Sequence, residues 1–446
     1  MFFFLKMESI LGPLKINPIF IESKNRDSLF NQKLMSFNKL LILLLFLIPF
    51  ATFSQDKNLE YFINKASENS PLLYNLRNQI LSNSIDSQIL VASRRLQVSG
   101  NGNSFYSPTI GGFGYDESLT NGGQLQALIT ASKTIVPKKW AGYQFKDLQL
   151  TGDSLKVAAT ISKRDLNKSI ITQYITAYGD QLQLEFNHEI SQLLNREEII
   201  LKKLTQQNVY KQVDYLSFLV TFQQQQLTQK QLELQFKNDY ASLNYLAGEF
   251  DTTTTLLPQP SLENVKALSR DSSAYFYKFK IDSLKLINNK FLIDLGYRPH
   301  INLFVDGGFQ SSVSQFSLLH VGRSIGVNFV IPLYDGNQRR LQYNKIKVLE
   351  DSRVRNQQFF INQYNQQIAQ LSQQLTAIES LIIPINNQIN YIKTLLEAYG
   401  KLLQTGDIKM TDYILALNNY ITARNLVVQN QVSRYQIINQ LNYWNK

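Results

Sequence analysis

The sequence predicts a mainly α-helical chain built from two tandem halves, each of which carries a pair of β-strands forming a hairpin. Residues 213–219 (VDYLSFL) are similar to residues 411–417 (TDYILAL), which indicates an internal duplication. Residues 138–207 and 338–405 place an apolar side chain at every third or fourth position, as long helices do. Each half is therefore expected to run helix, strand, loop, strand, long helix, turn, long helix.

The two halves are separated by residues 251–270, which hold a run of threonines and two prolines and have the composition of a linker. We therefore expect a first repeat over residues 55–250 and a second over residues 271–446. Pro384 lies inside the second long helical stretch. It should kink or break that helix, because proline removes a backbone hydrogen bond.

Residues 35–54 have the pattern of a signal peptide: a lysine, an apolar stretch from Leu40 to Phe50, and small residues at the cleavage positions. This stretch is shorter than the about 20 residues that a membrane-spanning helix needs. We expect translation to start at Met35 and residues 1–34 to be an extension from a mis-assigned start. The alternative is an N-terminal membrane anchor.

The composition argues against several classes of site. The chain has no Cys, which excludes disulfides and thiolate metal ligands. Its net charge of +11 is spread along the helical stretches, so we expect no nucleic-acid groove. The three histidines lie in unrelated segments, at His188, His300 and His320. We expect no metal site, no cofactor and no enzymatic activity, and we interpret Glu197 and Glu198 as a solvated helix face.

Four segments alternate apolar and polar residues as β-strands do, at about 104–115, 124–136, 300–310 and 321–332. Each is about 10–12 residues long, the length of a tilted strand that crosses a bilayer. A soluble two-layer sheet is the alternative. A sheet in lipid must close on itself, and four strands are too few to enclose a pore. Three copies of the chain would supply twelve.

The second strand of each half stops at a proline and is followed at once by a long helix. Pro137 ends the first, and Pro332 ends the second where its missing N–H does least harm. Asp335 and Gly336 then redirect the chain into the helix. If the last strand lies in a membrane, we expect Val327, Phe329 and Ile331 to face lipid. Asn328 should face the lumen.

The two pairs of long helices are expected to turn at residues 204–214 and 402–412. Gly406 permits the positive φ that commonly ends a helix, and Asn208, the residue most tolerant of that conformation after glycine, stands at the matching place in the first half. Asp214 and Asp412 then fall in the first turns of the helices that follow. An acidic residue there stabilises the helix N-terminus by about 0.3–1 kcal/mol.

Taken in order, these features resemble the outer membrane efflux protein family, the TolC-like channels. The resemblance covers nearly all of residues 55–446 and is carried by tandem halves and several short motifs. These motifs are NSPLL at 69–73, P-x-I-x-L at 299–303, VIPLYDG at 330–336, Pro384, and the spacing from Gly406 to Asp412.

The resemblance implies a homotrimer in the outer membrane of a Gram-negative bacterium. Its twelve-stranded β-barrel would be continuous with a twelve-helix α-barrel that crosses the periplasm. The implied function is the passive exit duct of a tripartite efflux pump or type I secretion system. The implied partners are a periplasmic adaptor protein, an inner-membrane RND or ABC transporter, and outer-membrane lipid. The alternative function is a soluble periplasmic coiled-coil adaptor or structural protein.

The resemblance also places the periplasmic entrance of the channel at the two helix turns. Asp214 and Asp412 from three subunits would then line the entrance as a ring of carboxylates that favours cations. This role and the stabilisation of the helix N-terminus are compatible. The apolar neighbours Ile408 and Leu415 leave open whether polar contacts also hold the entrance shut.

Overall fold

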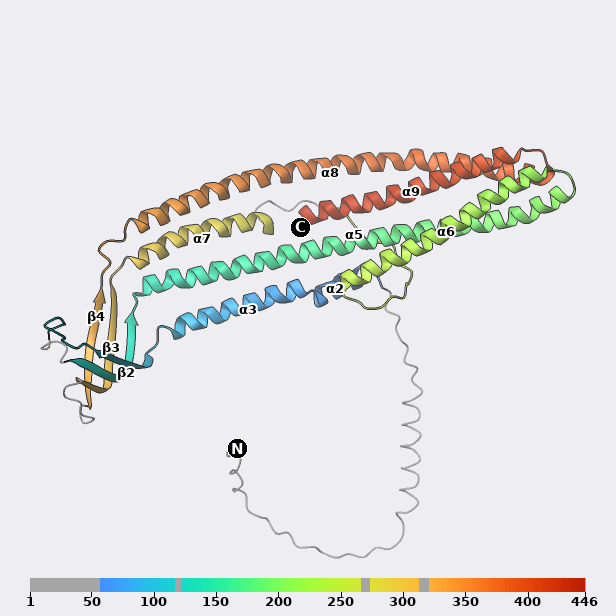
Figure 1. Cartoon of the computed structure of the whole chain (residues 1–446). Helices are drawn as coiled ribbons and strands as arrows, with labels where there is room; N and C mark the ends of the chain where they lie inside the picture. Colours follow the sequence, from blue (N-terminus) through green and yellow to red (C-terminus); the bar gives the residue numbers. More distant parts are fainter. Residues whose placement is uncertain (1–56, 117–121, 266–272, 313–320, 446) are drawn as a thin grey trace, which may run out of the picture. The chain divides into compact units, whose positions relative to one another are not determined.

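The computed structural model describes residues 57–116, 122–265, 273–312 and 321–445, and the expected signal peptide and upstream extension lie outside them. This part of the chain is mainly helical, with one four-stranded antiparallel sheet (Figure 1). The first half contains α2 (Leu59–Asn69), α3 (Pro71–Ala92), β1 (Gln97–Tyr106), β2 (Gly123–Ile135), α5 (Lys138–Gln206) and α6 (Gln212–Ala247). The second half contains α7 (Ala274–Gly296), β3 (His300–Ser312), β4 (Val321–Val330), α8 (Gln338–Thr405) and α9 (Met410–Asn445).

The same order of elements recurs in the two halves, with closely similar lengths. The long helices α5 and α8 have 69 and 68 residues, and α6 and α9 have 36 residues each. The first half adds a break between α2 and α3 at NSPLL. There the Ser70 hydroxyl accepts a hydrogen bond from the Leu73 N–H, and Pro71 occupies the first helical position, where its missing N–H has no cost. The boundaries of the two repeats within the linker stay a prediction.

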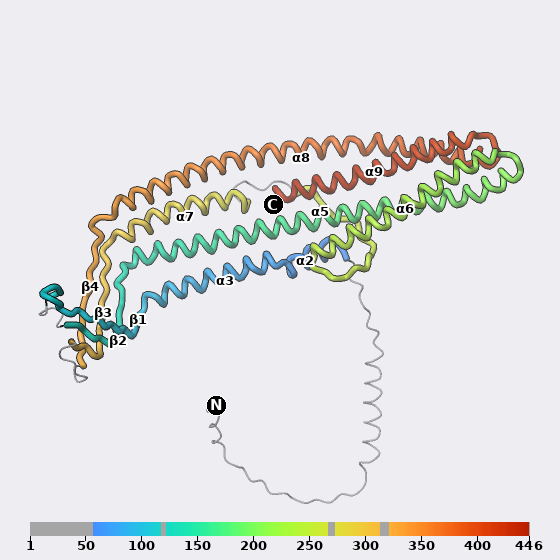
Figure 2. The backbone as a smooth tube through the Cα atoms, viewed as in Figure 1, coloured from blue at the N-terminus to red at the C-terminus, as the bar shows by residue number. Residues whose placement is uncertain are grey.

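The long helices lie side by side, with the sheet at one end and the two helix turns at the other (Figures 1 and 2). Near the sheet the order of neighbours is α3, α5, α7, α8; near the turns it is α6, α5, α9, α8. Helix α5 is therefore the central element. Two side-chain amides from neighbouring helices donate to backbone carbonyls of α5. Asn83 of α3 donates to the Leu148 carbonyl at 3.0 Å, and Asn288 of α7 donates to the Tyr143 carbonyl at 3.0 Å.

The buried core follows α5 along its length. One cluster centres on Phe62, Tyr174 and Tyr240, and joins α2, α5 and α6. A second cluster, near the helix turns, joins α5, α6, α8 and α9. Helix α9 approaches α5 closely at Gly179, which faces the side chain of Val432. A Cβ at position 179 would collide with that valine, so the close approach requires glycine.

The sequence predicted a kink or a break at Pro384, and the break does not occur: α8 is one continuous helix from Gln338 to Thr405 with Pro384 inside it. The ring of Pro384 removes one N–H from the helix, but the helix continues for more than twenty residues beyond it. Packing compensates: Ile385 and Ile389 directly after the proline are buried against Ala423 of α9. Tertiary contacts of this kind override the local preference of proline.

The predicted strand at about 104–115 was also wrong, since β1 spans Gln97–Tyr106. The chain turns after Pro108, where Gly111 and Gly112 adopt positive φ and Ile110 pairs with Phe113 across the turn. Proline and glycines of this kind make turns more readily than strands. Strands β2, β3 and β4 lie where they were predicted, to within two residues at each end.

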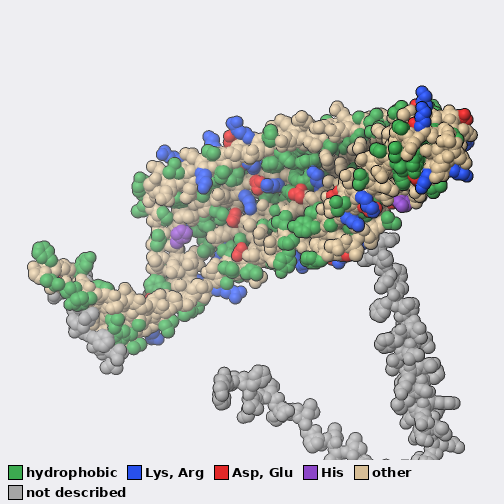
Figure 3. Space-filling view, turned by 45° about the vertical axis from the view of Figure 1, so that its right-hand side comes forward, with side chains coloured by type: hydrophobic (Ala, Val, Ile, Leu, Met, Phe, Trp, Pro, Cys, Tyr) green, Lys and Arg blue, Asp and Glu red, His purple; other side chains and the backbone are tan. Residues whose placement is uncertain are grey.

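The sheet has the order β1-β2-β3-β4 and two faces of opposite character. One face is polar and carries cross-strand hydrogen bonds from Asn101 to Thr130 (2.9 Å) and from Thr134 to Asn302 (3.3 Å). The other is apolar and exposed: Ile325 is 83% and Val327 is 65% exposed. Further exposed apolar side chains of that face are Val98, Ile129, Ile135, Leu303, Val305, Val321 and Phe329. Charged side chains gather over the helices, whereas the visible surface of the sheet is mostly apolar or uncharged (Figure 3).

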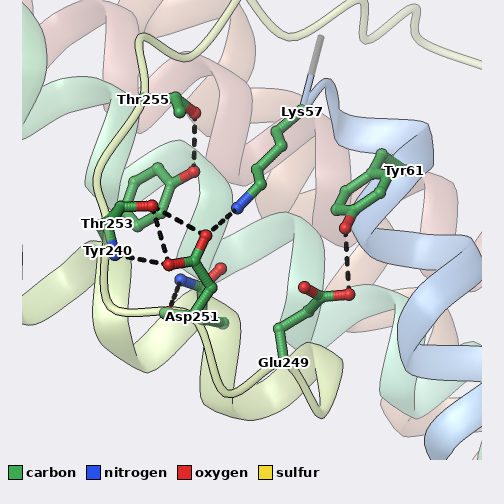
Figure 4. Close-up of polar contacts among 8 residues, drawn as sticks. Lys57, Tyr61, Tyr240, Glu249, Asp251, Thr253 and Thr255 are labelled. Carbon is green, nitrogen blue, oxygen red and sulfur yellow. Dashed lines mark hydrogen bonds and ion pairs between the residues drawn. The ribbon is translucent and has the colours of Figure 1, made fainter. Parts of the chain in front are cut away.

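The segment after α6 is held against the start of α2 by a group of polar contacts (Figure 4). The Asp251 carboxylate accepts from the Lys57 ammonium at 2.9 Å and from the backbone N–H of Thr253 at 2.9 Å. The hydrogen bond from the Thr253 N–H is the main reason that the pKa of Asp251 lies well below its usual range, and the bond from Lys57 adds to the effect. The Tyr61 hydroxyl donates to Glu249 at 3.0 Å. The described start of the linker is therefore anchored to the helices.

Candidate functional site

The two helix turns form the first candidate site, and both close as the sequence predicts. Gly406 has φ 80° and Asn208 has φ 61°, so both adopt the left-handed conformation. The N–H groups just beyond them, at Val209 and Asp407, donate to carbonyls in the last turns of α5 and α8. These bonds satisfy helix carbonyls that would otherwise lack a partner.

Tyr210 joins the first turn to the second. Its hydroxyl lies 3.1 Å from the carbonyl oxygens of both Leu403 and Ile408, to which it donates, and the side chain is only 8% exposed. Next to it the Val209 side chain packs on Gly406, where a Cβ would collide with it. The two turns are thus joined by the hydrogen bonds of Tyr210 and by the contact of Val209 with Gly406.

Asp214 and Asp412 lie in the first turns of α6 and α9, as expected. The Asp214 carboxylate accepts a hydrogen bond from the backbone N–H of Lys211 at 3.3 Å, which is the interaction of a helix cap. The structure therefore places both aspartates at the same end of the helices, beside Asn208 and Gly406. Their role in ion selection stays a prediction.

Glu197 is buried, so its interpretation as part of a solvated face was wrong. It continues the apolar stripe of Ile190, Leu194 and Leu201 on α5 and is 8% exposed, and its Oε2 has no hydrogen-bond partner among the described residues. Burial raises the pKa of the Glu197 carboxyl. The next residue, Glu198, accepts a hydrogen bond from Tyr215 at 2.5 Å. The spacing of Glu197 within the stripe was the signal that sequence reasoning overlooked.

The two strand-to-helix junctions form the second candidate site. Pro137 lies between β2 and α5, and its carbonyl accepts from the N–H of Trp140 at 3.0 Å. Strand β4 ends at Val330, so Pro332 follows two residues after the ladder stops. Ile331, expected on the lipid face of the strand, lies just beyond it and is exposed.

Asp335 and Gly336 redirect the chain into α8. Gly336 and Asn337 both have positive φ, and the Asp335 carboxylate accepts from the N–H groups of Asn337 (2.9 Å) and Arg339 (2.7 Å). The bond from the Arg339 N–H is the main cause that holds the pKa of Asp335 below its usual value. Asp335 therefore acts as the cap of α8, a helix whose N-terminus would otherwise expose unpaired N–H groups.

Arg339 binds Asp294 of α7, with Nε at 3.1 Å, and the Tyr343 hydroxyl donates to the same carboxylate at 2.6 Å. Partial burial by itself would raise the pKa of Asp294, but the bonds from Tyr343 and Arg339 together outweigh it and lower the pKa. The junction is thus fixed to its neighbouring helix by a charged network. Sequence reasoning missed Asp294, because its partner lies forty-five positions away in the chain.

Neither a metal centre nor a spanning helix accompanies these sites in the described ranges. No group of three or more His, Cys, Asp or Glu side chains there could hold a metal ion. Across the same residues, no helix is both long and apolar enough to cross a membrane.

The fold matches those of solved outer-membrane channels. The outer membrane protein VceC from Vibrio cholerae has a TM-score of 0.72 and 12% identity, over 87% of this chain and 96% of that one. The CmeC outer membrane channel of Campylobacter jejuni has a TM-score of 0.69 and 13% identity, over 87% and 85% of the two chains. The MtrE outer membrane channel of Neisseria gonorrhoeae, in its open state, has a TM-score of 0.66 and 12% identity, over 86% and 88%.

No protein-family model matches the sequence, and no curated protein matches it either. The structural likeness nevertheless spans most of both chains in each comparison. The chain has the fold of the outer-membrane channels.

Proposed function

We propose that the chain is an outer-membrane channel, the passive exit duct of a tripartite efflux pump or a type I secretion system. The observation that carries this proposal is the two-faced sheet. Its apolar face is exposed over the strands, which would be unfavourable in water and is the arrangement of a barrel strand in lipid. The fold shared with solved channels over nearly the whole chain supports the same function.

The working unit is a homotrimer. Strands β1 and β4 are the edges of the sheet, and their outer backbone groups need partners inside a membrane. Pairing β4 of one copy with β1 of the next keeps the alternation antiparallel. Three copies give three times four strands, a closed twelve-stranded barrel.

The helices support the same pairing of copies. Helix α8 lies at one edge of the helical layer, and α3 and α6 lie at the other. Both edges carry exposed apolar side chains. On α6 they recur every seven residues, the spacing of a helix that packs along another helix: Val213, Val220, Leu227 and Leu234. On α8 they include Leu341 and Val348. The helical edges thus continue the interface that the strand edges begin, and a twelve-helix α-barrel follows.

The helix turns then form the periplasmic entrance, with Asn208, Asp214, Gly406 and Asp412 around it. There the duct would meet a periplasmic adaptor and, beyond it, an inner-membrane RND or ABC transporter that supplies the energy. A soluble periplasmic coiled-coil protein is the weaker candidate, because it gives no reason for the exposed apolar face of the sheet. The channel function requires no catalytic residue and no cofactor.

Two adjacent residues of β2 test the membrane orientation. Ile129 lies on the apolar face and Thr130 on the polar face. Ile129→Lys should strongly reduce assembly into the outer membrane. It adds a second basic side chain to the row of the apolar face that already holds Arg323, and a lysine facing lipid near mid-depth costs about 2–4 kcal/mol. Thr130→Lys, which adds the same charge to the lumen side, should leave a heat-modifiable trimer that requires detergent. Equal assembly of the two variants, or a detergent-free soluble monomer in the wild type, would refute the proposal.

A further inference from the structure

Asp306 is the one Asp, Glu, Lys or Arg side chain on the polar face of the four described strands. The register sets this face: Ser99, Thr130, Asp306 and Ser324 lie in one row across the sheet. The other positions of the polar face are occupied by amides, hydroxyls, glycines, one histidine and a few apolar side chains. The histidine, His300, lies at the far end of the same strand.

The two basic side chains of the strands lie on the opposite, apolar face. Lys133 pairs with Leu303, and Arg323 pairs with Gly307. No described ion pair joins Lys133 or Arg323 to Asp306, although Arg323 lines the same hollow as Asp306.

Asp306 also occupies the middle of its strand, the seventh residue of the thirteen in β3. The Ser324 hydroxyl donates to its carboxylate at 3.3 Å, a long bond that leaves the carboxylate with capacity to accept more. The surface beside it is a hollow of about 430 Å³, lined by Leu128, Asp306, Gly308 and Gln310 and, from β4, by Val321, Gly322, Arg323 and Ser324. Gly308 on the same strand and Gly322 on β4 have no side chain and leave this space open.

An ionisable side chain at mid-depth of a membrane-spanning segment faces water and serves function as a rule. We propose that Asp306 from three copies of the chain forms a ring of carboxylates halfway along the barrel lumen, which makes the outer barrel favour cations over anions. This inference rests on the trimeric channel proposed above. It adds a second selective position, in the membrane part of the duct and apart from the helix turns.

The strength of such a ring depends on salt. The screening length is about 30 Å at 0.01 M and about 3 Å at 1 M ionic strength. Three carboxylates on the wall of an open barrel therefore act across its lumen at low salt and are screened near 1 M. Cation selectivity supplied by Asp306 should rise steeply as the salt concentration falls.

The first test is the reversal potential of the purified trimer in a planar bilayer, under a potassium chloride gradient at low salt. In Asp306→Asn the permeability ratio of potassium to chloride should fall by about twofold or more relative to wild type. Asp306→Glu should keep the wild-type ratio. The control is Lys133→Gln, which changes the net charge by one unit in the opposite sense on the apolar face, away from the hollow, and should leave the ratio unchanged.

The second test uses the absence of cysteine from the chain. In Asp306→Cys, a charged methanethiosulfonate reagent added in water should modify the thiol and change the conductance. In Val305→Cys, the neighbouring residue on the apolar face, the same reagent should have no effect. This pair measures the position of residue 306 independently of selectivity.

The outcomes separate the two proposals. A wild-type protein that forms no conducting trimer would refute the proposed function itself. A wild-type trimer that conducts, with an unchanged ratio in Asp306→Asn or an unreactive Asp306→Cys, would overturn the inference about Asp306 and leave the channel intact.

Discussion

The hydroxyl of Tyr210, in the turn between α5 and α6, lies 3.1 Å from the carbonyl oxygen of Leu403, near the end of α8. A second carbonyl, that of Ile408, lies at the same distance. One side chain of the first half thus satisfies backbone groups of the second half. The movement of either turn away from the other would break this bond.

Tyr210→Phe should loosen the second helix turn without unfolding the protein. The change removes the donor to the Ile408 carbonyl, whereas the Leu403 carbonyl keeps the Gly406 N–H as a partner at 3.4 Å, so the cost should be about 1 kcal/mol. Hydrogen exchange of the amides in residues 402–412 should become faster, while exchange in the rest of α8 stays as in wild type. Tyr245→Phe is the matched control, because that tyrosine is exposed. Equal exchange in Tyr210→Phe and wild type would show that the bond does not hold the turns together.

Gly406→Ala should destabilise the same turn for a different reason. Gly406 has φ 80°, which costs a residue with a side chain about 1–2 kcal/mol, and its new Cβ would meet the Val209 side chain. Adding Val209→Ala should recover the steric part of the loss but not the backbone part. Asn208→Gly, at the matching turn, should be neutral or stabilising. Thermal unfolding in detergent checks all three, and an unchanged midpoint for Gly406→Ala would contradict this account.

Two buried carboxyl groups of α5 predict a stability that falls as pH rises. The Asp180 side chain is 4% exposed. Burial and the nearby Asp239 carboxyl raise the pKa of Asp180 to about 7. The hydrogen bond that Gln235 donates to it at 2.8 Å acts in the opposite direction. Burial also raises the pKa of Glu197. Each of these carboxyl groups has a higher pKa in the folded than in the unfolded state, where it is about 4. Its contribution to the stability of the fold is present while it is protonated and is lost as the pH rises from about 4 through the folded-state pKa.

The midpoint of thermal unfolding should therefore drop between pH 5 and pH 8 in the wild type. Asp180→Asn and Glu197→Gln should each flatten this dependence and be more stable than wild type at pH 8. Glu198→Gln, a neighbour that is not buried, is the control and should keep the wild-type slope. A wild-type midpoint that rises over this range, or one that both variants follow in parallel, would be inconsistent with these buried acids.

Asp412→Ala and Asp214→Ala test the carboxylate ring at the helix turns. If these side chains line the entrance, each change should lower cation selectivity in planar-bilayer recordings. Asp214→Ala should also lower stability by about 0.5–2 kcal/mol, because its carboxylate caps α6. Unchanged selectivity in both variants would leave only the capping role.

The sequence located the features that depend on local chemistry. The long helices follow from their apolar period, and the turns from Gly406 and Asn208, whose backbone preference is intrinsic to the residue. Strand β4 follows from clean alternation. Strand β1 was misplaced because Gly100 and Gly102 dilute the alternation that marks a strand.

The features that the sequence did not reveal depend on distant partners. Continuity of α8 through Pro384 depends on packing against α9. The bonds of Tyr210 and of Asp294 join segments that are remote in the chain. Asp306 was visible as one polar residue among others, and only the register of four strands shows that its face holds no other charge.

The most direct test of the central claim is the conductance of the purified, detergent-extracted protein in a planar lipid bilayer. An outer-membrane channel should insert as a trimer and give discrete steps of ion current. Ile129→Lys should insert far less often, while Thr130→Lys gives steps like the wild type. A wild-type protein that leaves the bilayer silent, or that remains monomeric in water without detergent, would contradict the account.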